Sequence, residues 1–568
     1  MLFKKFRTLF LVISLLAASV TAISFTDDYF EVTRNIDIFV TLFRELNANY
    51  VDEIKPGTLV KKGIDSMLES LDPYTNYIPE SDIEDYRFMT TGQYGGIGAL
   101  IGQRNDEVII TDPYENYPAQ KADLRAGDVL VEIDGKLLKG KKYDEVSKIL
   151  KGQPKTVVKI KVRRDGEKEL LEKSVTREEI KINNVPYSGI IGEDVGYIRL
   201  TGFTENAGME VKNALTDLKA KKQLKGVILD LRGNPGGLLH EAVNIVNIFT
   251  PKGVEVVTTR GKIKDADKVY KTLSTPVDTG LPVAVLVNSM SASASEIVSG
   301  AIQDLDRGIT IGQRTFGKGL VQTTRPLSYN AQLKVTTAKY YIPSGRCIQA
   351  VDYTHRKDDG SVGKIPDSLI SEFKTKSGRV VYDGGGIIPD FITSPRYVSP
   401  ITRALISKYL IFDYATWYHR THPSIAPALQ FKLSDAEYDA FVKWLEPKEY
   451  EYSTRSEKSL EDLKKFAEKE KYFEAIKSEY EQLQKKMMHD KTKDLYKYKD
   501  EITELLQAEI SSRYYFQNGR VEAGFAYDTD IKKALEAIAS PQVFAQIINR
   551  PPVKNPPVDD EEKEGQGE

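Results

Sequence analysis

The chain has 568 residues, with 80 lysines and arginines against 82 aspartates and glutamates, which gives a formal charge of −2. This balance does not indicate a nucleic-acid partner, and at about 150 residues per domain the length excludes a single-domain protein. The one cysteine, Cys347, excludes an intrachain disulfide and a metal site built from cysteines.

The N-terminus, residues 1–22, is typical of a secretory signal. It has a basic start, an apolar run from Leu9 to Ala18 and small residues around Ala22. The alternatives are an uncleaved membrane anchor and a buried N-terminal helix. No later stretch approaches the roughly 18 apolar residues of a membrane span. We therefore expect the rest of the chain to be exported, to the periplasm or cell envelope, either free or held by that N-terminal segment.

Residues 27–87 predict a helical region, because apolar residues such as Ile36, Phe39 and Leu42 recur at a spacing of three or four. Residues 88–175 predict a small β-rich module, in which glycines separate short strands and one helix lies near residues 143–150.

Residues 176–395 alternate strands with helices. The segments GVILDL (226–231) and PVAVLV (282–287) predict buried strands, each followed by a helix, and a third strand begins at residue 309. Near-continuous apolar strands with helical crossovers predict a parallel sheet that is covered on both faces.

The C-terminal part of the chain contains two segments of different composition. Residues 396–550 are helical in pattern and highly charged, which predicts a separate helical domain with solvated faces. Residues 551–568 are rich in proline and carboxylates and predict a disordered acidic tail.

Three unusual loops follow the strands of the α/β region. They are RGNPGG (232–237), NSMSASASE (288–296) and GQRTFGKGLVQ (312–322). Ligands of open parallel sheets bind beyond the carboxyl ends of the strands. We therefore expect the three loops to line one crevice.

The second loop is crowded with serines at the start of a predicted helix. A serine hydroxyl there lies near free N–H groups, which stabilise a developing oxyanion. The alternative is a cluster of N-cap residues without chemistry, since serine is a favoured cap. The glycines of the first loop can supply further N–H donors, although glycines also follow strands simply to make a turn.

A serine nucleophile requires an adjacent base, and the third loop offers Lys318. Its glycine and apolar neighbours would desolvate the amine, lowering a lysine pKa from about 10.4 to roughly 7 to 8, where the neutral amine is a general base. Gln322 lies four residues later on the same side and could hold the amine. The alternative for Lys318 is an exposed loop lysine. His240 lies in a predicted helix, where a packing or surface role is favoured.

In this order, the three loops resemble the C-terminal processing peptidases, which are tail-specific serine proteases with a Ser–Lys active site. The resemblance covers most of residues 30 to 395 and includes LDPYT (71–75), YGGIG (94–98), YIPSGR (341–346) and GGIIPD (385–390). Its most specific part is the pair SASASE and FGKGLVQ.

The resemblance implies a role for each site residue. Ser293 would be the nucleophile, Lys318 the base and Gln322 the residue that orients it. The oxyanion N–H groups would belong to Ala294 and to Gly236 or Gly237, which the sequence does not separate. No metal or cofactor is implied, and His240 has no role.

The β-rich module resembles the PDZ domain of this family. PDZ domains bind peptide C-termini along a sheet edge while a glycine-rich loop captures the carboxylate. The resemblance assigns that loop to Gly95, Gly96, Ile97 and Gly98, with Leu100 near the side-chain pocket. It implies a multidomain α+β fold, in which the PDZ-like β module precedes an α/β protease core of the ClpP/crotonase type, with helical regions at both ends.

Together these features predict an exported serine endopeptidase that binds unstructured, apolar protein C-termini and cleaves near them through an acyl-enzyme. The helical regions could dimerise or dock an adaptor. One alternative is a PDZ scaffold with a silent protease domain, which the intact set of Ser293, Lys318 and Gln322 argues against. An acyl-CoA enzyme of crotonase type is disfavoured by the export signal and the PDZ module.

Overall fold

The structure, a computed structural model, describes residues 30–548 except residue 358 and residues 488–490. The predicted signal (1–22) and acidic tail (551–568) lie outside the described residues. The chain divides into two compact units, and the first ends at Tyr77 while the second begins at Ile78.

The first unit contains helices. Residues 30–49 are helical, α2 follows at Pro56–Glu69, and β1 (Asn76–Ile78) lies at the boundary between the units. Pro56 occupies the first turn of α2, where its missing N–H costs no helical hydrogen bond. Within the described part of the chain, no helix is long and apolar enough to cross a bilayer.

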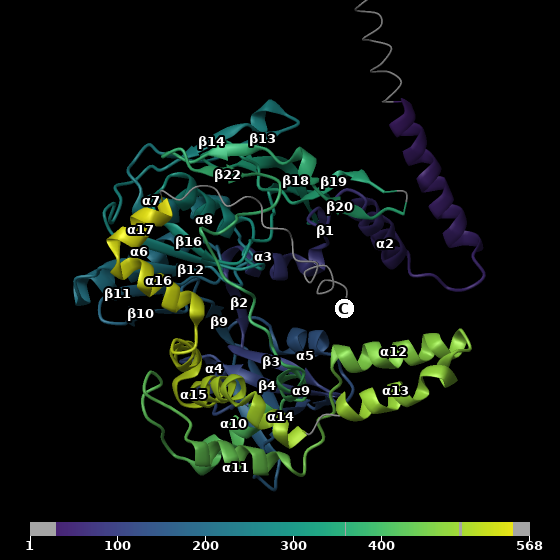
Figure 1. Ribbon diagram of the computed structural model, residues 1–568. Coiled ribbons are helices and arrows are strands. Elements are labelled where there is room, and N and C mark those ends of the chain that lie inside the picture. The colour runs from purple at the N-terminus through teal and green to yellow at the C-terminus, as the bar shows by residue number, and fades with distance from the viewer. Residues whose placement is uncertain (1–29, 358, 488–490, 549–568) are drawn as a thin grey trace, which may run out of the picture. The chain divides into compact units, whose positions relative to one another are not determined.

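The β-rich module is an antiparallel sheet with two short helices (Figure 1). Its strand order is β3-β4-β5-β7-β8, and β6 pairs with β5. The elements are β3 (Ala99–Arg104), β4 (Glu107–Pro113), α4 (Pro118–Lys121), β5 (Val129–Ile133), β6 (Lys136–Leu137), α5 (Tyr143–Leu150), β7 (Val157–Arg163) and β8 (Leu171–Thr176). On β7, Val158, Ile160 and Val162 are fully buried. They alternate with more exposed residues, as expected for a sheet with one solvated face.

A two-stranded ribbon connects this module to the rest of the second unit. The chain enters through η1 (Glu80–Asp82), α3 (Ile83–Thr91) and β2 (Gln93–Gly96), and leaves through β9 (Glu178–Lys181). Strands β2 and β9 pair antiparallel, so entry and exit run side by side.

The α/β core is a sheet in the order β10-β11-β12-β15-β16-β23. Strand β10 is antiparallel to β11, and the other pairs are parallel. The strands are β10 (Tyr187–Ile191), β11 (Val195–Arg199), β12 (Gly226–Asp230), β15 (Val283–Val287), β16 (Ile309–Gly312) and β23 (Phe391–Ile392). Every residue of β12 and β15 is buried, so both faces are covered and the predicted parallel sheet is confirmed.

The two faces of this sheet are covered by different parts of the chain. One face packs against α6 (Ala207–Lys221), α7 (Leu239–Phe249) and α8 (Ala294–Asp304). The other packs against α16 (Thr529–Ala539), with α17 (Pro541–Ile548) beside it. Figure 1 shows these last helices against the strands of the core, far from them in sequence.

A second, antiparallel sheet carries the third loop. It includes the strands β14-β13-β18-β17 in that order. The remaining elements of this region are β13 (Glu255–Gly261), η2 (Lys264–Ala266), β14 (Lys268–Lys271), β17 (Leu320–Pro326), β18 (Gln332–Tyr341), β19 (Val351–Arg356), β20 (Val362–Lys364), η3 (Asp367–Leu369), β21 (Glu372–Lys374) and β22 (Val380–Tyr382).

The C-terminal helices, apart from the pair α12 and α13, divide between two cores. They are α9 (Pro400–Ser407), α10 (Leu410–Thr421), α11 (Asp435–Leu445), α12 (Arg455–Lys469), α13 (Phe473–Met487), α14 (Lys491–Lys497) and α15 (Lys499–Gly524), followed by α16 and α17. Helices α9, α10, α11, α14 and the first part of α15 share an apolar cluster. Helix α15 kinks at Tyr515 and Phe516, after which the chain joins the core sheet.

The packing of α16 on the sheet can be tested with Ile538→Ala. Ile538 is buried, and it lies so close to β12 that a Cβ built on Gly226 would come within 2.5 Å of its Cγ2 atom. We expect the free energy of unfolding to fall by about 2 to 5 kcal/mol, because a cavity opens in the core. Denaturant unfolding measures this, with exposed Lys532→Ala as control. If the free energy of unfolding fell as little in Ile538→Ala as in Lys532→Ala, the packing of α16 on the sheet would be contradicted.

Candidate active site

The three loops meet at one cavity of about 620 Å³ in the second unit. Its lining includes all six residues that the sequence assigned to catalysis and to the oxyanion hole, which are Ser293, Lys318, Gln322, Gly236, Gly237 and Ala294. His240 is largely exposed and does not line the cavity.

The serines of the SASASE turn differ in their surroundings. Ser291 and Ser295 are fully buried, and their hydroxyls donate to the carbonyl oxygens of Leu231 (2.8 Å) and Asn234 (2.9 Å). They tie this turn to the glycine loop. Ser293 is the one of the three that lines the cavity as the structure describes it.

Ser293 has a strained backbone. Its φ of 55° and ψ of −111° lie outside the regions that L-residues favour. Such a conformation costs on the order of 1 to 3 kcal/mol and persists only where neighbouring contacts impose it. It places Ser293 immediately before α8, at the helix N-terminus.

The contact that holds this turn is the buried carboxylate of Glu296. Its Oε2 accepts the N–H groups of Ser293 (2.8 Å) and Lys318 (2.9 Å), and its Oε1 accepts the Gly317 N–H (2.7 Å) and the Thr315 hydroxyl (2.6 Å). One side chain therefore fixes the backbones of Ser293 and Lys318. Burial raises the pKa of Glu296 to about 7, against the lowering effect of the four donors.

Close backbone packing shapes the loop of Lys318. A Cβ on Gly317 would lie 2.4 Å from the Ala350 Cβ, and one on Gly319 would lie 2.8 Å from the Gln349 nitrogen. Both positions thus require glycine, because another part of the chain approaches each backbone closely. The Phe316 N–H donates to the Ser291 carbonyl at 3.1 Å, which joins this loop directly to the serine turn.

Side chains of the second sheet also line the cavity, among them those of Gln322 and Tyr340. The Gln322 amide donates to the Thr336 hydroxyl at 3.1 Å, so its neighbour on β18 holds the side chain. Buried Tyr340 donates its hydroxyl to the Ser293 carbonyl at 3.2 Å.

The structure distinguishes the two candidate glycines of the oxyanion hole. Gly236 packs against the serine turn, but its N–H donates to Asn234 Oδ1 at 2.9 Å. Among the described residues, the N–H groups of Gly237 and Ala294 have no hydrogen-bond partner. Both residues line the cavity, so these two amides can donate to a ligand.

The glycine loop is anchored by Arg232 at its base. The guanidinium pairs with Asp230 (2.7 Å) and with two carboxylates at the start of α16, Asp528 (2.7 Å) and Asp530 (3.0 Å). Helix α16 therefore contacts the loop that carries Gly237 as well as the core sheet.

Comparisons with known proteins match three segments of the chain. Residues 194–355 match peptidase family S41, residues 109–164 match a PDZ domain, and residues 401–538 match the C-terminal helical domain of probable PDZ-proteases. A carboxy-terminal-processing protease of Bartonella bacilliformis is 36% identical over 342 residues, which cover 60% of this chain and 77% of the relative. The chain belongs to peptidase family S41.

Other similar proteins have related names. A probable CtpA-like serine protease of Staphylococcus aureus is 35% identical over 350 residues, covering 61% of this chain and 67% of the relative. A solved structure of a photosystem II D1 C-terminal processing protease is 28% identical, with a TM-score of 0.34 and coverage of 62% of this chain and 86% of that chain. The chain is thus a serine-type peptidase of the carboxy-terminal-processing kind, with a PDZ domain before its S41 domain.

The YGGIG segment of this S41 peptidase is only partly a loop. Gly95 and Gly96 lie in β2, where they pair with Glu179 and Glu178. Glycine is required at position 95, because a Cβ there would come within 2.2 Å of the Gly152 carbonyl. Gly95 and Gly96 are therefore part of a paired strand, and their role in binding a carboxylate stays a prediction.

The other residues of the peptide-binding prediction divide between core and surface. Ile97 is buried in the PDZ core, whereas Gly98 turns the chain with a φ of 71°. Leu100 is 43% exposed on β3, which ends the sheet and pairs only with β4 among the described strands.

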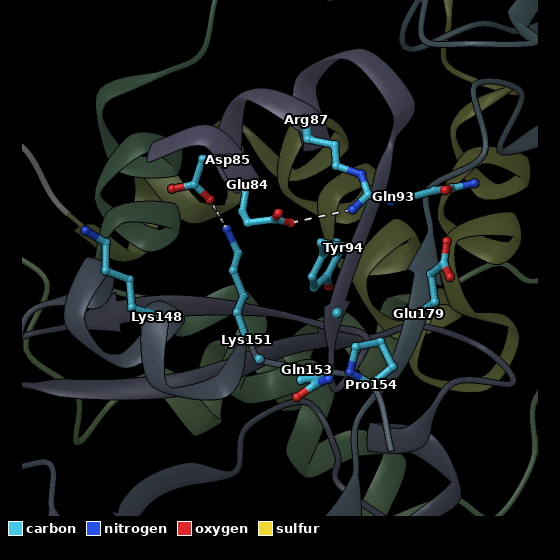
Figure 2. A pocket seen from close by; sticks show the side chains of 12 residues that line it. Glu84, Asp85, Arg87, Gln93, Tyr94, Lys148, Lys151, Gln153, Pro154 and Glu179 are labelled. Carbon is cyan, nitrogen blue, oxygen red and sulfur yellow. Dashed lines mark hydrogen bonds and ion pairs between the residues drawn. The ribbon is translucent and has the colours of Figure 1, made fainter. Parts of the chain in front are cut away.

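A second cavity, of about 490 Å³, lies beside Gly95 (Figure 2). Side chains of α3, Tyr94 and the end of α5 line it, and Lys151 pairs with Asp85 across it at 2.7 Å. Figure 2 shows the Lys151 side chain crossing the cavity towards α3. Its Nζ also lies 5.8 Å from the ring centre of Tyr94, within range of a cation–π contact.

Sequence reasoning missed Glu296, Tyr340 and the acidic partners of Arg232. Glu296 could have been found, because it stands three residues after Ser293 at capping-box spacing. Asp528 and Asp530 carry no such signal, since nearly 300 residues separate them from Arg232.

The role of Glu296 can be tested with Glu296→Gln. The amide offers one acceptor oxygen in place of two, so either the N–H groups of Ser293 and Lys318 together or the N–H group of Gly317 face the amide nitrogen and lose their acceptor. Since a displacement of about 1 Å can cost 10²-fold, we expect kcat on a peptide substrate to fall about 10²-fold with little change in KM. Glu437→Gln, in the capping box of α11, is the control. Wild-type kcat for Glu296→Gln would contradict the positioning role.

The pH profile gives a separate test of the same carboxylate. Because the pKa of Glu296 is raised to about 7, protonation as pH falls through this value weakens its hold on the two backbones. We expect log(kcat/KM) of the wild type to fall more steeply with decreasing pH than that of Glu296→Gln. The slope of the acid limb should differ by the ionisation of one group. Parallel acid limbs in the two proteins would show that this ionisation has no effect on catalysis.

Proposed function

We propose that the protein is an exported serine endopeptidase, which binds apolar C-termini of unstructured proteins through its PDZ domain. It cleaves peptide bonds near them through a Ser293–Lys318 acyl-enzyme mechanism. The observation that carries the proposal is the Glu296 carboxylate, which binds the backbones of Ser293 and Lys318 at 2.8 and 2.9 Å beside one cavity.

In the proposed mechanism, neutral Lys318 accepts the proton of the Ser293 hydroxyl as Oγ attacks the substrate carbonyl carbon. The N–H groups of Gly237 and Ala294 donate to the oxyanion. The protonated amine then gives its proton to the leaving nitrogen, and the C–N bond breaks. Water attacks the resulting ester with Lys318 again as base, which releases the new C-terminus and restores Ser293.

Gln322 has the orienting role in this proposal. Its amide nitrogen is already fixed by the Thr336 hydroxyl on the neighbouring strand. The amide oxygen is then directed by that contact and can accept a hydrogen bond from the amine of Lys318.

The proposed peptide site is the edge of β3. An extended C-terminus can add to this edge by backbone hydrogen bonds, with exposed Leu100 contacting its apolar side chains. The turn at Gly98 stands at the start of β3, where the terminal carboxylate would lie. Export rests on the sequence of residues 1–22.

The mechanism is tested with Ser293→Ala and Lys318→Ala in the full chain, assayed on an unfolded protein with an apolar C-terminus. We expect kcat/KM to fall at least about 10³-fold in each, because nucleophile and base act as one unit. Exposed Ser289→Ala and Lys339→Ala should retain activity.

Undiminished cleavage by either active-site variant would refute the mechanism. A folded wild-type protein that binds the peptide, but neither cleaves it nor reacts with a serine-directed probe, would instead support a scaffold role.

A further inference from the structure

The lining of the active-site cavity contains a second lysine, Lys334. This residue lies on β18, and its side chain is half-buried. Apart from Lys318 and Lys334, the ionisable side chains that line the cavity are Tyr86 and Tyr340. The cavity therefore has amines but no carboxylate in its described lining.

Lys334 has no anionic partner in the part of the chain that the structure describes. No carboxylate there lies within 4.0 Å of its amine. Burial lowers the pKa of Lys334, and no neighbouring charge offsets this effect. A partly desolvated amine without a counter-ion is unfavourable in the free protein, and a bound anion would relieve that cost.

The strand register fixes where Lys334 lies relative to Gln322. Lys334 is opposite Thr324, and Thr336 is opposite Gln322. Opposite residues of antiparallel strands share a face, so Lys334 lies on the face of Gln322, two residues further along. At about 3.4 Å per residue this is about 7 Å, which an extended peptide covers with about two residues.

We propose that Lys334 is a subsite residue that binds a carboxylate of the substrate about two residues from Gln322. The carboxylate is either the side chain of an aspartate or glutamate or the α-carboxylate of a chain end that the PDZ domain has released. This inference rests on the proposed function, because it takes the cavity as the place where the peptide binds.

The test uses the full chain with Lys334→Met, Lys334→Arg and Lys339→Met. Methionine keeps the length of the side chain and removes the charge. Lys339 is an exposed lysine of the same strand that does not line the cavity. Four matched peptides share one apolar sequence. Each has Glu or Gln two residues beyond the cleaved bond, and each of these two sequences is made with a free and with an amidated C-terminus.

We expect wild-type protein to cleave peptides with the correctly placed carboxylate about 10 to 100 times more efficiently, in kcat/KM, than their neutral counterparts, as for a charged hydrogen bond. Lys334→Met should lose the part of this preference that Lys334 supplies, whereas Lys334→Arg and Lys339→Met should keep it. Carboxylate binding by the PDZ domain also favours the free C-terminus over the amide, but it contributes equally in all variants. The pair whose preference falls in Lys334→Met therefore identifies the source of the carboxylate.

Equal kcat/KM of Lys334→Met and wild type, or an equal loss for anionic and neutral peptides, would overturn the proposal. Peptide affinity measured in a Ser293→Ala background separates the two hypotheses, since binding needs no chemistry. A carboxylate preference that depends on Lys334 there, without cleavage by wild-type protein, would refute only the proposed function. Cleavage that depends on Ser293 without such a preference would refute only the role of Lys334.

Discussion

The active-site arrangement depends on the hydrogen bonds that the buried carboxylate of Glu296 accepts. Ser293 and Lys318 are 25 positions apart in sequence and belong to different loops, so nothing local sets their distance. The carboxylate accepts the N–H of each, at 2.8 and 2.9 Å, and holds Ser293 in a strained conformation. The Gly317 N–H and the Thr315 hydroxyl donate to the other oxygen, so the two carboxylate oxygens together accept four donors. Burial makes the arrangement costly, and it raises the pKa of the same carboxyl.

The C-terminal helices are part of the peptidase core as well as an extension of it. Helix α16 covers one face of the parallel sheet, which would otherwise expose apolar residues such as Ile228 and Leu286. At its start, Asp528 and Asp530 neutralise Arg232 at the base of the glycine loop. The oxyanion donor proposed at Gly237 therefore depends on residues almost 300 positions away. Removal of the C-terminal region would affect the catalytic loop and the stability of the core together.

Helix α3 lines two cavities of the second unit. Its residues Glu84, Asp85 and Arg87 face the cavity beside the PDZ domain, whereas Tyr86, Phe88 and Met89 line the active-site cavity. Tyr86 also hydrogen bonds to Thr324, which lies opposite Lys334 on the neighbouring strand. Any displacement of α3 would alter both cavities, because one short helix supplies a wall to each.

Features that depend on neighbours in sequence could be predicted for this chain, whereas features that depend on distant residues could not. The strand and helix around each loop were predictable, since GVILDL, PVAVLV and the helix after Ser293 are decided by apolar runs and capping. Resemblance located the residues of the cavity. Neither the local sequence pattern nor the family resemblance could show that Gly95 belongs to a strand. Its partner strand β9 comes after the whole PDZ module in sequence. Likewise, Lys334 has no distinctive neighbours in sequence. The role proposed for Lys334 rests on the register of β17 on β18 and on the absence of a carboxylate in the described lining. Both are properties of the folded chain.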